Sequence, residues 1–97
     1  MTTVKIDPIL KPLIPTFLEN RQKDILDLKT AISAGDFEAI RIIGHNFRGS
    51  GKGYGFTLIT DLGTTLEEAA QAQDMTTIES TVSELADYLD NVEPVYE

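Results

Sequence analysis

The chain has 97 residues, no cysteine and a formal net charge of −8 at pH 7. This length provides for one hydrophobic core, so we expect a single domain over residues 1–97. The lack of cysteine excludes disulfides and thiolate metal sites, and the acidic balance disfavours nucleic acid and anionic membranes as partners. No apolar run is long enough for a signal peptide or a membrane span, which indicates a cytoplasmic protein.

The N-terminal part of the chain predicts an irregular segment followed by a long helix. Residues 1–9 are expected to be largely extended, with room for a short additional helix around residues 9–14. From Pro15 to Ser33 apolar residues recur at helical spacing, and Gly35 is placed to cap the C-terminus of this helix. The residues expected on its buried face are Leu18, Ile25, Leu28 and Ile32.

A second helix is predicted to begin after Asp36, whose side chain is of a type that caps helix N-termini. Glycines 51, 53 and 55 end this helix and form a tight connection. Its apolar stripe, expected to be buried, contains Phe37, Ile40, Ile43 and Phe47.

Two further helices follow. The third begins at about Phe56, and the turn after it is marked by Asp74; Thr76 and Glu79 then have the spacing of a capping box for the fourth helix. The apolar seam of the fourth helix consists of Ile78, Val82, Leu85, Leu89 and Val92. Period-two alternation and hairpin dipeptides are absent, so no strand is expected. The predicted fold is all-α, an antiparallel up-down four-helix bundle with its core at about residues 13–92.

The single histidine, His45, is predicted to face solvent. At about 100° per residue it lies about 145° from the centre of the apolar stripe of the second helix. Arg41, Arg48 and Lys52, at −4, +3 and +7 from the histidine, belong to the same outer sector. Gly49, at +4, leaves the adjacent surface without a side chain.

This grouping has a chemical interpretation. A neutral imidazole is a nucleophile, and neighbouring cations both disfavour its protonation and offer charge-assisted hydrogen bonds to a phosphoryl group. The alternative is a solvated surface histidine whose neighbouring cations pair with acids such as Glu38. A metal site is not expected, because His45 has neither a second histidine nor a cysteine as co-ligand.

The glycine-rich stretch 49–55 does not predict a nucleotide site. Gly51-Lys52 is followed by Gly53 where a P-loop needs serine or threonine, and the preceding segment is helical where a strand is required. We therefore expect no cofactor and no kinase or nucleotide-binding site.

The run from His45 to Ser50, HNFRGS, resembles the signature of histidine-containing phosphotransfer (HPt) domains of two-component phosphorelays. That signature is a histidine, any residue, a hydrophobic residue, lysine or arginine, and glycine. The likeness covers about residues 13–92. Positions that continue it in register are Gly55, Ile59, Leu62, Gly63, Leu66 and Glu67.

The resemblance implies a stoichiometric phosphocarrier that exchanges a phosphoryl group with an aspartate of a response-regulator receiver domain, and not an enzyme. It implies that His45 is the phosphoacceptor, that Arg48 steadies the phosphoryl oxygens and that Gly49 admits the receiver, with Arg41 and Lys52 beside the contact. Arg48 replaces the commoner lysine; its fixed charge preserves the role. A histidine kinase or hybrid kinase is a further implied partner, and a monomer is expected.

Two alternatives stay open at this stage. Glu67 holds a position that carries glutamine or glutamate in related domains, where it can accept the Nδ1 proton of the histidine and leave Nε2 free. It can equally be a solvated edge residue.

The chain can also be a binding module that docks on receiver domains or other signalling partners without carrying phosphate. Met1 and the predicted complete bundle favour a free-standing protein over a piece of a larger kinase.

Overall fold

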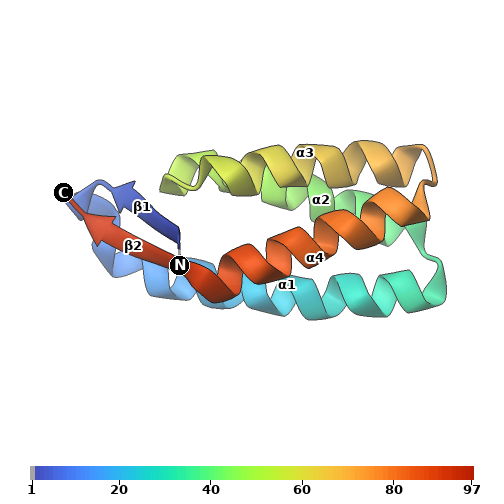
Figure 1. Ribbon diagram of the computed structural model, residues 1–97, viewed down its shortest axis with the longest axis horizontal. Helices are drawn as coiled ribbons and strands as arrows, with labels where there is room; N and C mark the ends of the chain where they lie inside the picture. The colour runs from blue at the N-terminus through green and yellow to red at the C-terminus, as the bar shows by residue number, and fades with distance from the viewer. Residues whose placement is uncertain (1) are drawn as a thin grey trace.

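Four α-helices account for most of the computed structural model, which describes residues 2–97 and is 79% helical. Each helix runs antiparallel to the one before it, and α4 returns alongside α1 (Figure 1). The helices are α1 (Ile14–Ala34), α2 (Phe37–Ser50), α3 (Thr57–Gln71) and α4 (Met75–Asn91). This arrangement confirms the predicted all-α four-helix bundle. None of the helices in the described part of the chain has the length and hydropathy of a membrane span.

The helix ends follow local sequence chemistry. Gly35 adopts a left-handed conformation, with φ of 63°, where α1 stops, and the Asp36 carboxylate accepts the Ala39 N–H at 3.1 Å to begin α2. The capping box predicted for α4 is wrong. Asp74 is the N-cap and accepts the Thr77 N–H at 3.2 Å, which places Thr76 inside the first turn of the helix.

Short 3₁₀ helices fill the two irregular segments. The helix expected near residues 9–14 is present as η1 (Pro8–Leu13), and η2 (Lys52–Tyr54) lies within the glycine-rich connection. Gly55 follows η2 with φ of 92°, a conformation that favours glycine.

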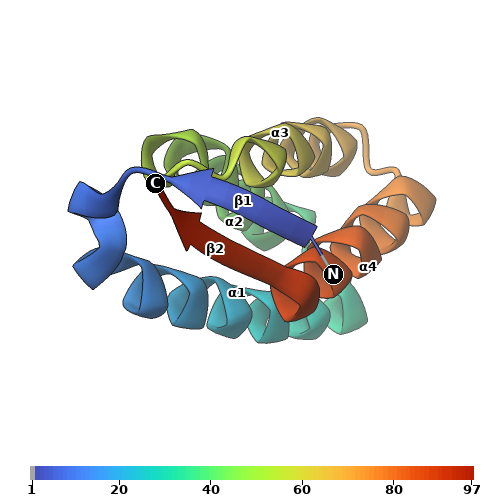
Figure 2. The same ribbon diagram turned by 60° about the vertical axis from the view of Figure 1, so that its left-hand side comes forward.

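The expectation that the chain contains no strand is wrong. Strand β1 (Thr2–Ile6) pairs in parallel with β2 (Val92–Tyr96) at one end of the bundle, from Thr2 opposite Val92 to Ile6 opposite Tyr96 (Figure 2). Val92 therefore opens a strand and does not extend the seam of α4. Each strand has only five residues; the alternation in β1 is limited to residues 4–6, and β2 contains Pro94, so neither segment is long or regular enough to be recognised as a strand.

The core runs along the bundle axis and fixes the rotation of α2. Phe47 and Ile40 are fully buried there, whereas Ile43, predicted to be buried, is only partly so. The largest fully buried side chains on the other elements are Ile6, Ile14, Leu28, Phe56, Ile59, Leu66, Ile78 and Leu85. The most extensive packing in the bundle is between α2 and α3. These two helices carry the candidate site.

Candidate functional site

His45 lies midway along α2, on the side of the helix away from Phe47. Its side chain is 60% exposed, whereas Phe47 is 0% exposed two residues later. The exposure of His45 that the helical phase predicted is thus confirmed. The ring is anchored to a folded helix and open to solvent, which leaves it accessible to a macromolecular partner.

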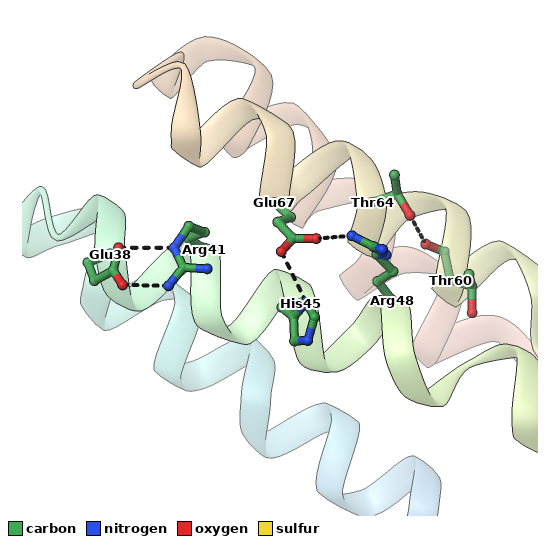
Figure 3. Close-up of polar contacts among 7 residues, drawn as sticks. All are labelled: Glu38, Arg41, His45, Arg48, Thr60, Thr64 and Glu67. Carbon is green, nitrogen blue, oxygen red and sulfur yellow. Dashed lines mark hydrogen bonds and ion pairs between the residues drawn. The ribbon is translucent and has the colours of Figure 1, made fainter.

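Glu67 approaches His45 from the neighbouring helix α3. Its Oε2 lies 3.0 Å from His45 Nδ1, and the residue is 7% exposed although it is charged (Figure 3). The interpretation of Glu67 as a solvated edge residue is therefore wrong. A buried carboxylate needs polar partners, and the imidazole supplies one of them.

Arg48 supplies the second partner. Its Nη1 donates to Glu67 Oε1 at 2.7 Å, so one carboxylate bridges two side chains of α2 (Figure 3). The Arg48 hydrogen bond is the main cause that holds the pKa of Glu67 below its ordinary value; the contact with His45 acts in the same direction, against the effect of burial. The sequence did not predict this ion pair. Such a pair between two helices can be predicted only when it is known how each helix is rotated toward the other.

The other two cations, Arg41 and Lys52, make no contact with the Glu67 carboxylate among those of the described residues. The Arg41 guanidinium makes two hydrogen bonds to Glu38, a pairing that also lowers the pKa of Glu38. Arg41 therefore pairs with a neighbouring acid, as in the alternative interpretation of the sequence. Lys52 lies beyond the end of α2, in η2, and its backbone N–H donates to Thr60 Oγ1 at 2.7 Å. Because α2 ends at Ser50, the rotation of 100° per residue does not predict the position of Lys52.

The surface next to His45 is open and partly apolar. A Cβ atom added at Gly49 would meet none of the described residues within 4 Å beyond its own helix turn, so the surface one turn after His45 is open. Ile42, one turn before His45 on α2, is 47% exposed. The described residues include no cluster of three or more metal-ligating side chains. The groups that converge are an imidazole, a buried carboxylate and a guanidinium, beside an open surface.

Comparison with known proteins identifies the family of the chain. The family model described as Hpt domain matches residues 12–94 of the 97 residues. No curated protein and no solved structure matches the chain. Domains of this family have a phosphotransfer role in phosphorelays, as carriers of the phosphoryl group. The chain belongs to the Hpt domain family.

Proposed function

We propose that His45 accepts a phosphoryl group on Nε2 from the aspartyl phosphate of a response-regulator receiver domain and returns it to such an aspartate. The observation that carries this proposal is the contact between His45 Nδ1 and the buried Glu67 carboxylate. A carboxylate accepts a hydrogen bond and cannot donate one, so it favours the tautomer with the proton on Nδ1. The lone pair of the ring is then on Nε2, and that edge of the ring points away from Glu67 (Figure 3).

The transfer is a direct displacement at phosphorus. The Nε2 lone pair forms the N–P bond while the bond from phosphorus to the aspartyl oxygen breaks, and the aspartate leaves with the electron pair. The ring keeps its Nδ1 proton and becomes positively charged. Glu67 lies beside that proton, so it orients the imidazole and compensates its charge, as a carboxylate does in a catalytic triad. Transfer in the other direction reverses each step.

Arg48 has the charge and the spare donors to bind the phosphoryl oxygens. One of its N–H groups is bound to Glu67, and a guanidinium has five. Its side chain is 52% exposed, so further donors can turn toward a group attached to His45. This fixed positive charge favours a transition state in which negative charge is shared among the phosphoryl oxygens.

The open surface around the histidine suits a macromolecular donor. Gly49 leaves room for a partner's backbone, and the exposed Ile42 adds an apolar contact beside it. Arg41 and Lys52 lie before and after the site in the chain and are candidates for contact with the partner, although the charge of Arg41 is matched by Glu38. A module that only docked on receivers would not require a buried carboxylate behind an exposed imidazole. The phosphocarrier is therefore the better supported function.

Labelling tests the proposal. Incubated with a phosphorylated receiver domain, the protein should gain one phosphoryl group in an acid-labile, base-stable phosphoramidate. The H45Q variant should gain none, and circular dichroism should show that it keeps its helices because the replaced side chain is exposed. Equal labelling of H45Q would rule out His45 as the phosphoacceptor.

A further inference from the structure

The backbones of α2 and α3 come very close at several glycines, and two of these, Gly44 and Gly63, lie beside the candidate site. A Cβ atom at Gly44 would lie 2.9 Å from the Glu67 backbone nitrogen and 3.3 Å from Glu67 Cα. A Cβ atom at Gly63 would overlap the Arg48 backbone nitrogen and lie 2.8 Å from Phe47 Cβ. Because these atoms belong to the backbone or to the root of a buried side chain, they cannot turn aside. A methyl group at either glycine must move one helix away from the other.

The contacts of both glycines fall on the residues of the site. Gly44 immediately precedes His45 in α2, and the backbone against it is that of Glu67. Gly63 lies one turn before Glu67 in α3, and the backbone against it is that of Arg48. The separation of the helices at this point therefore fixes how far the Glu67 carboxylate reaches toward His45 and Arg48.

The distances from the Glu67 carboxylate to His45 and Arg48 can increase only slightly before the hydrogen bonds weaken. The Glu67 carboxylate is 3.0 Å from His45 Nδ1 and 2.7 Å from Arg48 Nη1, and hydrogen bonds of this kind extend to about 3.2 Å. Ordinary carbon contacts begin near 3.4 Å, so relief of the contact with Phe47 Cβ alone requires a shift of about 0.6 Å. A shift of this size weakens both hydrogen bonds unless the side chains rearrange.

We infer that Gly44 and Gly63 are positioning residues, whose lack of a side chain sets the helix separation at which Glu67 holds the Nδ1 edge of His45. The consequence for phosphoryl transfer rests on the function proposed above; the consequence for the imidazole does not. Gly51 is packed as closely, but against Phe56 and Thr60 and not against Glu67 or Arg48. Two glycines of the same region are open. Gly49 and Gly53 have nothing within 4 Å of an added Cβ atom, so their size does not control any helix contact.

Nitrogen-15 NMR of the imidazole ring tests the inference directly. His45 is the only histidine in the chain, so its two ring nitrogens give the only imidazole signals. The spectra of G44A and G63A are compared with those of the wild type, of E67A as the reference for a lost carboxylate, and of G53A as a matched glycine-to-alanine control. Circular dichroism and thermal melting report whether each variant is folded.

In the wild-type protein the neutral ring should be mainly protonated on Nδ1, and G53A should give the same spectrum. In G44A and G63A the population should move toward the Nε2-protonated form, as it does in E67A. Phosphoryl transfer should slow in the same variants, by up to about a hundredfold if the displacement approaches 1 Å.

Three results would overturn the inference: wild-type ring signals in folded G44A and G63A, an equal shift in G53A, or loss of the fold in both variants. In the last case the glycines would support the whole bundle and not the site in particular. Failure of the proposed function looks different. The ring signals would shift as expected, while even the wild-type protein accepted no phosphoryl group from a phosphorylated receiver.

Discussion

His45 and Glu67 are 22 residues apart and belong to different helices, yet Nδ1 of one lies 3.0 Å from Oε2 of the other. One of these side chains is 60% exposed and the other belongs to a residue that is 7% exposed. A reactive edge open to solvent is thus held from behind by a carboxylate that solvent hardly reaches.

Replacement of Arg48 should slow phosphoryl transfer. R48A removes the donor proposed for the phosphoryl oxygens and also the ion-pair partner of Glu67. Loss of one preorganised donor at an enclosed site raises the barrier by about 2.7–4 kcal/mol, and this site is open to water, so a smaller effect is expected. R48K should lose less than R48A because it keeps the charge. Rates come from quenched-flow labelling, with K5A at the strand end of the molecule as the control; an R48A rate equal to that of K5A would contradict the role.

Acidification should remove a stabilising contribution of Glu67. Because the hydrogen bond from Arg48 and the contact with His45 hold the pKa of Glu67 below its ordinary value, folding favours the ionised form. The contribution is fully present above the pKa of the unfolded chain, about 4.3, and is lost as pH falls through the lower pKa of the folded state. The difference in free energy of unfolding between wild type and E67Q, from urea titrations, should shrink below about pH 4. A difference that stays constant from pH 7 to pH 3 would contradict the ion pair.

A large side chain at Gly49 should obstruct the partner without disturbing the bundle. The space beside Gly49 is empty within 4 Å of an added Cβ atom, so G49Q should fold normally. Transfer from a phosphorylated receiver should slow because the glutamine occupies the surface next to His45. S83Q, at an exposed position of α4, is the matched control and should transfer at the wild-type rate. Equal rates for G49Q and S83Q would show that the receiver does not approach this surface closely.

Loss of the Phe47 ring should destabilise the bundle strongly. The residue is fully buried, and truncation of such a ring to alanine lowers the free energy of unfolding by about 3–5 kcal/mol. L58A, at a position that is 42% exposed, should change it much less. Chemical denaturation of both variants measures the difference. Similar values for the two would place Phe47 outside the core.

Features that depend on neighbouring residues in the chain, such as helical phase and helix ends, could be predicted from the sequence. The helical phase of α2 placed His45 outside and Phe47 inside, and Asp36 and Gly35 marked adjoining helix ends. Contacts between helices were harder to predict, because rotation about α2 says nothing about α3. The Arg48–Glu67 ion pair was missed for this reason.

The parallel strands were missed because they pair the two ends of the chain. The segments Thr2–Ile6 and Val92–Tyr96 are separated by the whole bundle, and neither stabilises a strand alone. Local signals were also in competition at the start of α4, where Asp74 acts as the cap although Thr76 and Glu79 had the spacing of a capping box.

Pairing of the two chain ends also determines how the molecule responds to mechanical force. A pull on the N-terminus draws β1 backward along its axis, and a pull on the C-terminus draws β2 forward, so the parallel strands are loaded in shear. The hydrogen bonds between them then lie across the direction of the load and share it, instead of opening one after another. Tension applied through the ends is borne by this strand pair before it reaches α2 and α3. The histidine and its carboxylate are thereby shielded from strain that enters at the termini.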